Sequence, residues 1–573
     1  MRIALAQLDL TVGALRENRA RIADACADAA RRGADLVVAP ELALSGYPPE
    51  DLVLRPSFLA ACARELVALA AEATAPLLVG LPMLDGDRPR NSAALCVGGE
   101  VVARYDKRLL PNYGVFDETR TFEAGRHPLA LEACGALVSV TICEDIWLPG
   151  PSESAAAAGA TVIANLSASP YHLGKGESRE QMLRTRARDG LVFVAFCNIV
   201  GGQDELIFDG RSCVIDPEGE VIARAATFAE ELLVCDIDPS MAVAARLRDA
   251  RLRHGRRRAP KRLEPVASVA GAAGAPSDRL APRVAEPPAL PDEELWGALR
   301  LGLRDYVQKN GFGRVLIGMS GGIDSALVAA LAAEALGAEY VQAISMPTRF
   351  NASETRNDAR DVAERLGIGF RELAIEDLRL AFSDSLPEAT GLAAENLQAR
   401  IRGVILMTLS NQYGWLVLTT GNKSETATGY STLYGDTAGG FAPIRDVPKT
   451  RVFALARWLN ERAGRELIPS SIIERPPSAE LRADQRDDQS LPPYEQLDPV
   501  LEAYVEDDRS PREIAAAGIG DLDLAVRVAR LVDVAEYKRR QAPPGLKLHP
   551  KAFGRDRRVP ITNRFLQNGE ESP

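Results

Sequence analysis

A glycine-rich turn between an expected strand and an expected helix most strongly constrains how this chain can fold. The apolar run 315–319 predicts a strand, and the alanine-rich segment 326–336 has helical spacing. Residues 320–325 between them read Ser-Gly-Gly-Ile-Asp-Ser. Glycines let a backbone approach an anion closely, and a helix N-terminus offers unpaired N–H groups to it. The turn therefore predicts a phosphate-binding site, with a purely structural turn as the alternative.

This turn differs from the Walker A nucleotide-binding loop because no lysine follows its glycines. Asp324 cannot attract a phosphate, so we interpret it as a ligand for a metal ion that accompanies the phosphates. The turn resembles the pyrophosphate loop of the N-type ATP pyrophosphatases, which adenylylate a substrate and release pyrophosphate. The resemblance implies that ATP is bound by eight consecutive residues: Gly318, Met319, Ser320, Gly321, Gly322, Ile323, Asp324 and Ser325.

The length, charge and cysteine content of the chain limit the classes of protein to which it can belong. A chain of 573 residues exceeds one hydrophobic core and predicts roughly two to four domains. The net charge of −11 disfavours a nucleic-acid partner, and no apolar run of about 18 residues predicts a membrane span. Residues 1–18 lack a signal-peptide pattern because Asp9 interrupts their apolar run. The eight cysteines have neither zinc-site nor disulfide spacing, so we expect a cytoplasmic protein.

Composition divides the chain into three parts. Many short β-like runs fill residues 1–245, the expected first domain, and helical patterns resume in the expected second domain, 293–573. Residues 246–292 are predicted to form a linker, because 264–292 are rich in Ala, Pro, Val and Gly without periodicity. The basic stretch 246–258 is interpreted as a solvated helix end, with contact to nucleic acid or another subunit as the alternative.

Three reactive side chains lie at the ends of separate strands expected in the first domain. Glu41 follows a short apolar run, Lys107 ends an expected hairpin, and Cys143 follows another apolar run. If these strand ends align, the thiol can attack an amide carbonyl, the carboxylate can take its proton, and the ammonium can stabilise the oxyanion. Proximity to Lys107 would favour the thiolate. Three unrelated strand-end residues are the alternative.

The segments around these residues resemble the carbon–nitrogen hydrolase (nitrilase) superfamily. The resemblance rests on residues 40–52, 105–118 and 142–147, which occur in the order found in that family. It implies that the first domain is an α-β-β-α sandwich. It also implies that Glu41, Lys107 and Cys143 form a catalytic triad.

Further positions match the glutamine-using branch of this superfamily. The resemblance implies that glutamine is bound by Tyr113, Ser169 and Lys175. A helix cap or a turn is the alternative role of Ser169. Glu118 is expected either to orient Lys107 or to be a paired surface carboxylate, and Glu144 is expected to contact the amide.

Alternating strands and helices after the glycine-rich turn predict a parallel, doubly wound sheet in the second domain. Ligands of such sheets lie beyond the carboxyl ends of the strands. The expected strand 416–420 is followed by Gly-Asn-Lys-Ser-Glu, which brings Glu425 to the same edge as Asp324. The two carboxylates are therefore predicted to share Mg²⁺ with the phosphates of ATP. An ordinary helix-start carboxylate is the alternative for Glu425.

Five segments of the second domain resemble the glutamine-dependent NAD synthetases. These segments are 320–325, 395–400, 420–425, 428–436 and 551–562. With the amidase-like half, the resemblance covers nearly the whole chain. It implies a carbon–nitrogen ligase of NAD biosynthesis, which adenylylates the nicotinate carboxylate of deamido-NAD and displaces AMP with ammonia from L-glutamine. It also implies that Thr420 contacts ATP and that Asp436 lies near the pyridine ring. Deamido-NAD would be bound by Asn396, Glu425 and Lys538.

Functions of other classes stay open. A tRNA-modifying relative of the ATP pyrophosphatases would be expected to have paired cysteines or a basic extension, yet residues 236–573 contain no cysteine. A non-catalytic scaffold would be expected to have lost part of the Glu-Lys-Cys set. Free ammonia is mostly protonated near neutral pH and would escape to solvent. We therefore expect an enclosed path between the two sites, and a homo-oligomer whose interfaces help to form it.

Overall fold

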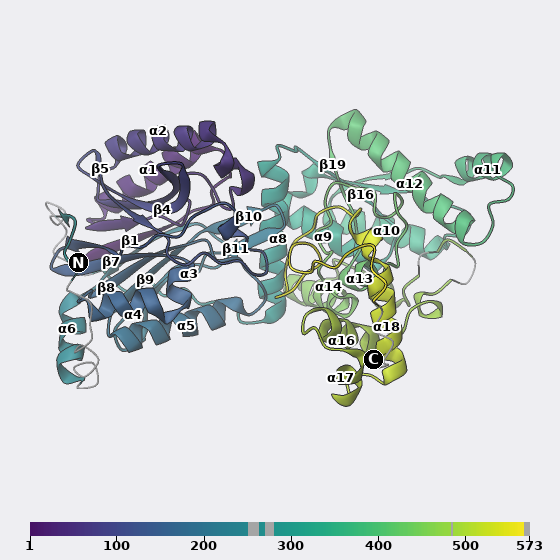
Figure 1. The fold of residues 1–573 in the computed structure, drawn as a ribbon. Coiled ribbons are helices and arrows are strands. Elements are labelled where there is room, and N and C mark those ends of the chain that lie inside the picture. The colour runs from purple at the N-terminus through teal and green to yellow at the C-terminus, as the bar shows by residue number, and fades with distance from the viewer. Residues whose placement is uncertain (250–262, 270–279, 479, 483–484, 566–573) are drawn as a thin grey trace. The chain divides into compact units, whose positions relative to one another are not determined.

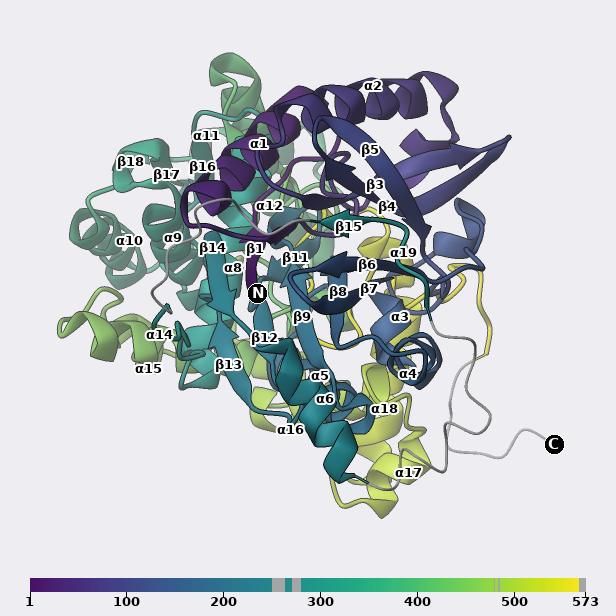
Figure 2. The ribbon, with the colours of Figure 1, turned by 90° about the vertical axis from the view of Figure 1, so that its left-hand side faces the viewer.

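The structure is a computed structural model of residues 1–573. It describes all of them except 250–262, 270–279, 479, 483–484 and 566–573. Contacts divide the chain into two compact units, Met1–Gln203 with Ile207–Ala289, and Asp204–Leu206 with Leu290–Pro573. Each unit has its own sheets and its own hydrophobic clusters, so the two are described in turn (Figures 1 and 2).

Two mixed sheets form the centre of the first unit. In the described residues, one sheet has the strand order β14-β1-β2-β3-β4-β5 and the other has the order β13-β12-β9-β8-β7-β6-β15. The strands of the first sheet are β1 (Arg2–Gln7), β2 (Leu36–Val38), β3 (Leu77–Asp85), β4 (Arg88–Val97), β5 (Glu100–Asp106) and β14 (Glu231–Asp236). Those of the second are β6 (Leu129–Ala133), β7 (Ala136–Ile142), β8 (Val162–Ser167), β9 (Phe193–Asn198), β12 (Cys213–Ile215), β13 (Val221–Arg224) and β15 (Ser268–Val269). A separate hairpin pairs β10 (Val200–Gln203) with β11 (Leu206–Asp209).

The two large sheets pack face to face and are covered by helices on their outer faces. β1 contacts β9, and β4 and β5 contact β7, around one cluster of buried aliphatic side chains. Helices α1 (Leu15–Arg31) and α2 (Pro56–Glu72) cover the first sheet, and α4 (Pro149–Ala157) and α5 (Lys175–Gly190) cover the second (Figure 1). The central strands β8 and β9 are buried along their whole length, as their continuous apolar sequences require. The predicted α-β-β-α sandwich is confirmed.

Part of the predicted linker belongs to the first unit. β15 adds a parallel strand to β6. Arg246, in α6 (Pro239–Arg248), is buried and donates to the carbonyls of Leu191 and Ala160. The predicted solvated helix end is therefore wrong for Arg246, because backbone carbonyls far away in the sequence attract its guanidinium. Most of the basic stretch, from residue 250 on, lies outside the described residues.

A parallel sheet of strand order β18-β17-β16-β19 forms the centre of the second unit. Its strands are β16 (Val315–Gly318), β17 (Val341–Ser345), β18 (Gly369–Glu372) and β19 (Leu416–Leu418). The helices that contact it include α9 (Ile323–Leu336), α10 (Ser353–Leu366) and α12 (Leu392–Tyr413). α10 ends at Gly367, whose φ of +69° favours glycine. The predicted α/β sheet is confirmed.

Further helices complete the second unit. They are α8 (Pro291–Lys309), α11 (Glu376–Ser385), α13 (Lys423–Thr428), α14 (Lys449–Ala463), α15 (Ser470–Glu474), α16 (Tyr494–Val505), α17 (Pro511–Ala516), α18 (Leu522–Val534) and α19 (Glu536–Arg539). Of the helices that can be described, none combines the length and the apolar character needed to cross a bilayer.

Candidate active sites

The structure brings Glu41, Lys107 and Cys143 together at the strand ends of the first unit. The Lys107 Nζ lies 2.7 Å from Glu41 Oε1 and 2.8 Å from Glu118 Oε1. Both Lys107 and Glu41 have fully buried side chains, and Cys143 is 2% exposed. Glu118 is therefore a buried partner of Lys107 and not a surface carboxylate.

Local backbone geometry explains how Glu41 reaches this position. Gly80 on β3 lies under the turn that carries Glu41, and a Cβ there would approach Leu42 N within 2.3 Å. Glu41 then accepts hydrogen bonds from Asn91 Nδ2 at 2.8 Å and from the backbone N–H of Ala168 at 3.0 Å. These contacts fix the carboxylate from both sheets.

Cys143 sits on a sharp turn between β7 and α3 (Glu144–Trp147). Its φ of +39° is unusual for a residue with a side chain, and such backbone strain often occurs at functional sites. Burial and the Glu41 carboxylate raise the pKa of the Cys143 thiol, and Lys107 offsets only part of that rise. The expectation that Lys107 would favour the thiolate is therefore outweighed by burial and by Glu41.

The other charged groups of this site titrate unusually for the same reasons. Burial raises the pKa of Glu118 to about 7, although Lys107 opposes the rise. Burial alone would lower the pKa of Lys107, but Glu118 and Glu41 raise it well above its usual value. Lys107 therefore stays protonated between two carboxylates.

Two of the three candidate glutamine ligands, Tyr113 and Lys175, approach helix α3. The Tyr113 hydroxyl donates to Glu144 Oε2 at 2.9 Å, and the Lys175 Nζ lies 5.7 Å from the centre of the Trp147 ring. Glu144 and Trp147 both belong to α3, so Tyr113 and Lys175 contact the helix that directly follows Cys143. Ser169 is buried after β8, and its backbone N–H donates to Asn198 at 2.9 Å.

A cavity of about 290 Å³ lies at the carboxyl ends of the parallel strands in the second unit. All eight residues of 318–325 line it, and so do Thr420, Glu425 and Asp436. Asn396 and Lys538 are absent from its lining. The cavity lies where ligands of doubly wound sheets bind.

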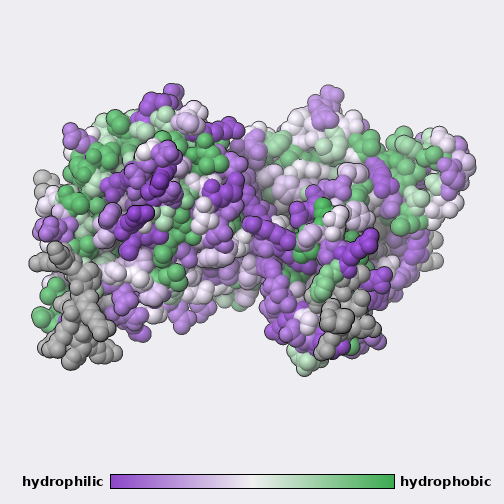
Figure 3. Space-filling model, in the orientation of Figure 1, coloured by the Kyte–Doolittle hydropathy of each residue, from purple (hydrophilic) through white to green (hydrophobic). Residues whose placement is uncertain are grey.

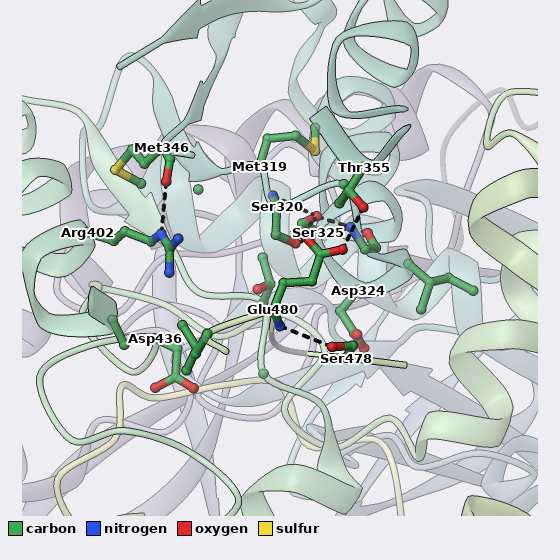
Figure 4. A pocket seen from close by; sticks show the side chains of 18 of the residues that line it. Met319, Ser320, Asp324, Ser325, Met346, Thr355, Arg402, Asp436, Ser478 and Glu480 are labelled. Carbon is green, nitrogen blue, oxygen red and sulfur yellow. Dashed lines mark hydrogen bonds between the residues drawn. The ribbon is translucent and has the colours of Figure 1, made fainter. Parts of the chain in front are cut away.

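The glycine-rich turn has the internal hydrogen bonds of an ordered loop. The Ser325 Oγ accepts from the Ser320 N–H at 3.3 Å, and the Gly322 N–H donates to the Ser320 Oγ at 3.2 Å. Gly321 has a φ of +81°, and a Cβ there would lie 2.1 Å from the Thr355 carbonyl oxygen. Figure 4 shows Ser320, Ser325 and Asp324 facing the cavity together with Thr355. Glycine is therefore required where α10 approaches this turn.

Asp324 and Glu425 meet at a lysine that the sequence pattern did not single out. Lys449 contacts an Asp324 oxygen, and its Nζ lies 3.6 Å from Glu425 Oε1. Asn422 Nδ2 also donates to Asp324 at 2.9 Å. Burial and Asp324 raise the pKa of Glu425 to about 8. Because Lys449 opens α14, far along the chain, its role depends on the tertiary fold.

Asn396 and Lys538 contact the segment 428–436 and do not line the cavity. Asn396 Oδ1 accepts from the Thr432 hydroxyl at 2.8 Å, and Lys538 Nζ donates to the Gly429 and Ser431 carbonyls at 2.7 and 2.8 Å. Asp436 ends the same segment, and burial raises its pKa to about 6. The structure thus brings these three residues to one segment, whereas Glu425 lies with Asp324.

Several cavity residues were missed by sequence reasoning. Arg402 donates to the Met346 carbonyl at 3.0 Å, and burial lowers its pKa to about 10. Glu480 accepts from the Thr355 hydroxyl at 2.7 Å (Figure 4). Both come from segments without a local motif, so only their tertiary position marks them.

Comparisons with known proteins assign both halves to families. Residues 2–247 match the carbon–nitrogen hydrolase family, and residues 295–542 match the NAD synthase family. The chain is 47% identical to the glutamine-dependent NAD(+) synthetase of Thermotoga maritima, over 99% of both chains. It is 44% identical to that of Aquifex aeolicus, over 99% of this chain and all of the relative.

A solved structure supports the same assignment. The glutamine-dependent NAD+ synthetase of Acinetobacter baumannii in complex with ADP superposes with a TM-score of 0.73 at 37% identity, over 98% of both chains. Fold and sites together define an amidotransferase-type ligase, in which an amidase domain is joined to a nucleotide-dependent synthetase domain. The chain belongs to the glutamine-dependent NAD(+) synthetase family. It is therefore a carbon–nitrogen ligase of NAD biosynthesis.

Proposed function

We propose that the chain makes NAD by amidating deamido-NAD with ammonia taken from L-glutamine. The first unit releases the ammonia, and the second unit activates the carboxylate of deamido-NAD with ATP. One observation carries this proposal: the chain contains both a buried Glu41–Lys107 pair beside Cys143 and a phosphate-type loop lining a cavity. Its membership of the family supports the same reaction.

In the amidase step, the Cys143 Sγ attacks the carboxamide carbon of glutamine, and its proton passes to Glu41. The Lys107 ammonium stabilises the negative charge that develops on the carbonyl oxygen. The proton on Glu41 then goes to the leaving ammonia, and water releases glutamate from the thioester. Because burial and Glu41 raise the pKa of the thiol, attack depends on this transfer to the base and not on a standing thiolate.

Tyr113, Ser169 and Lys175 are proposed to bind the glutamine. Helix α3 supports this assignment, because it begins directly after the nucleophile and both Tyr113 and Lys175 contact its side chains. Ser169 lies one residue beyond the backbone N–H that binds Glu41. Groups at these positions surround a substrate whose amide faces Cys143.

In the synthetase step, residues 318–325 and Thr420 are proposed to bind ATP. The nicotinate carboxylate of deamido-NAD attacks the α-phosphorus of ATP, pyrophosphate leaves, and ammonia then displaces AMP to form the amide. Deamido-NAD is proposed to be bound by Asn396, Glu425 and Lys538, with Asp436 near the pyridine ring. The contacts that Asn396 and Lys538 share with the segment 428–436 support this assignment.

Asp324 and Glu425 fit a Mg²⁺ ion that accompanies ATP. Both carboxylates approach the same cation, the Lys449 ammonium, so their oxygens converge. Mg²⁺ is commonly held by one or two carboxylates together with substrate phosphates. The Asp324–Glu425 pair fits this pattern. The described residues contain no group of three or more His, Cys, Asp or Glu side chains that could hold a metal ion. When bound, the ion would neutralise charge on the phosphates.

We also propose a homo-oligomer. Hydrophobic side chains gather on the surface over α11 and the start of α12 (Figure 3). The exposed residues there include Leu378, Leu380, Phe382, Leu386 and Leu392. Contiguous apolar patches of this kind commonly mark protein–protein contacts. Light scattering of the full chain tests this proposal, and a monomer that transferred ammonia with near-complete efficiency would contradict it.

The amidase domain is proposed to span residues 1–245 and the synthetase domain 293–573, joined by the linker 246–292, part of which packs on the first unit through β15. The matched family ranges, 2–247 and 295–542, support these bounds. A cytoplasmic location is proposed because the eight cysteines, all within the described residues, form no disulfide.

The experiment that tests the proposed function measures AMP formed from deamido-NAD and ATP, first with glutamine and then with an ammonium salt. Both nitrogen sources are expected to yield AMP and NAD. No AMP with either source would overturn the proposal. AMP with the ammonium salt alone would retain the synthetase reaction and remove the amidase role.

A further inference from the structure

A carboxylate that no step of the proposed reaction uses lies beside the amidase site. Asp145 follows Cys143 by two positions, within α3, and it is fully buried. It accepts hydrogen bonds from the Arg108 N–H (3.1 Å), the Leu109 N–H (2.9 Å), the Ile142 N–H (3.0 Å) and the Tyr105 hydroxyl (2.7 Å). The first two donate to Oδ1 and the last two to Oδ2, so both oxygens are fully used.

These four donors flank two proposed catalytic residues. Tyr105 precedes Lys107 by two positions, and the N–H groups of 108 and 109 follow it directly. Ile142 directly precedes Cys143. Lys107 follows β5 in the first sheet, whereas Cys143 follows β7 in the second. Asp145 thus connects the strand end that carries the ammonium to the turn that carries the thiol.

We propose that Asp145 is a positioning residue that sets the distance between Lys107 and Cys143 in the amidase reaction. This inference rests on the proposed triad. β5 and β7 belong to different sheets in the described part of the chain, and apolar packing between sheets has no preferred direction. Hydrogen bonds to the buried Asp145 carboxylate are directional and therefore fix how the two strand ends lie relative to each other. A displacement of about 1 Å in a catalytic group can lower the rate about 100-fold.

Glu41 has a comparable connection, which strengthens the argument. Its turn follows β2 in the first sheet, and its Oε2 accepts from the Ala168 N–H just beyond β8 in the second. The base and the ammonium therefore each have a hydrogen-bonded connection to the sheet that carries the nucleophile. The difference is that Glu41 makes its connection itself, whereas Lys107 is connected through Glu41 at its ammonium and through Asp145 at the backbone that follows it.

A carboxylate that only satisfied buried backbone donors would serve stability alone. Replacing the Asp145 carboxylate by an amide of the same shape distinguishes the stabilising role from the positioning role. In Asp145→Asn, an NH₂ group replaces one carboxylate oxygen and faces either the 108 and 109 N–H groups or the Ile142 N–H. Two hydrogen-bond donors then face each other, and the hydrogen bonds to one of the two strand ends are lost. Both roles predict a lower melting temperature, but only the positioning role predicts changed chemistry at Cys143.

The pH dependence of Cys143 reactivity reports the position of Lys107. The charged and titratable groups that interact electrostatically with this thiol are Lys107, Glu41, Glu118, Glu144, Tyr47, Tyr113 and Arg179. Lys107 lowers the pKa of the thiol. Movement of the ammonium away from Cys143 makes loss of the thiol proton less favourable, whether Glu41 or water accepts it, and therefore raises the pH at which Cys143 is half-reactive.

The test compares full-length Asp145→Asn with Val194→Ala and Cys143→Ala. Val194→Ala removes buried methyl groups from the same unit and supplies a matched loss of stability. Three quantities are measured: kcat and KM for glutamine hydrolysis, NAD formation from an ammonium salt, and the pH midpoint of inactivation by iodoacetamide. For Asp145→Asn we expect a fall in kcat of about 100-fold, a nearly unchanged KM, a raised midpoint and normal ammonia-driven synthesis.

Val194→Ala is expected to leave kcat and the midpoint unchanged. The inference is overturned if Asp145→Asn keeps its kcat, or if its midpoint stays that of the unsubstituted chain. If Asp145→Asn does not fold, Tyr105→Phe removes one of the four donors and should raise the midpoint by a smaller amount; an unchanged midpoint overturns the inference. If Cys143→Ala still hydrolyses glutamine, the proposed amidase site itself is wrong, which separates that failure from a failure of the Asp145 inference.

Discussion

The two sites of this chain differ in how their charges are compensated. In the amidase site, Glu41 and Lys107 have no exposed side-chain surface and are satisfied by each other and by neighbouring groups. In the synthetase cavity, the side chains of Asp324 and Glu425 are 17% and 20% exposed and share one lysine. A covalent reaction needs its groups held in advance. A site that binds a highly charged substrate and its ion needs carboxylates that such an ion can reach.

The largest expected effect separates the two sites. Cys143→Ala should lower glutamine-driven NAD synthesis by roughly 1000-fold or more, because it removes the proposed nucleophile. Synthesis from an ammonium salt should stay near normal, because the change is small and lies in the amidase unit. Both rates are measured as NAD formed, with thermal melting as the control for folding. Loss of ammonia-driven synthesis in a well-folded variant would contradict the independence of the two sites.

Asp324→Ala should affect the other site and both nitrogen sources. Adenylylation precedes amide formation, so AMP release should fall by about 100-fold or more with glutamine and with ammonium. Glutamine hydrolysis by the same variant serves as the internal control. Normal AMP release would disprove the assignment of Asp324, and Glu425→Ala should behave like Asp324→Ala if both carboxylates hold the ion.

Lys449→Met tests, through the free energy of unfolding, how the charges of the synthetase cavity are compensated. Removing one partner of a buried ionic group leaves two carboxylates facing each other and costs roughly 3 kcal/mol. The free energy of unfolding is measured by denaturant titration, with and without Mg²⁺. If the carboxylates bind the ion, Mg²⁺ should restore part of the loss in Lys449→Met and should not do so in Asp324→Ala. Equal effects of Mg²⁺ on both variants would argue against a shared ion.

The smallest effect concerns pH and the amidase site. The folded pKa of Glu118 is about 7, above its ordinary value of 4.5, so the folded state binds the proton more tightly than the unfolded state. Its contribution to stability is therefore complete below pH 4.5 and is lost as the pH rises through about 7. Glu118→Gln should remove this dependence. Its unfolding free energy relative to the unsubstituted chain should rise by about 2–3 kcal/mol between pH 4.5 and 8.

Unfolding curves at several pH values check this prediction. Glu50→Gln offers a control in the same unit, since the Glu50 side chain is far more exposed than that of Glu118. A pH-independent difference between Glu118→Gln and the unsubstituted chain would show that Glu118 titrates normally.

Local sequence patterns were sufficient where the relevant neighbours are close in the chain. The strand–turn–helix around 320–325, the helix Ser353–Leu366 with its terminal Gly367, and the strand ends before Glu41 and Cys143 all follow from short-range periodicity and turn chemistry. Such patterns depend on backbone preferences and on alternation of apolar residues, which each segment carries by itself.

Only the tertiary structure decided the features that depend on distant neighbours. Lys449 joins Asp324 to Glu425 from the start of α14, Arg246 is buried against carbonyls far away in the sequence, and Asp145 connects strand ends of two sheets. The raised pKa of Cys143 likewise depends on burial and on Glu41. The sequence by itself determined which reactive groups the chain contains and at which strand ends they lie. Their protonation and their partners were decided by the fold, because desolvation and charge–charge interactions depend on distances that short-range patterns do not encode.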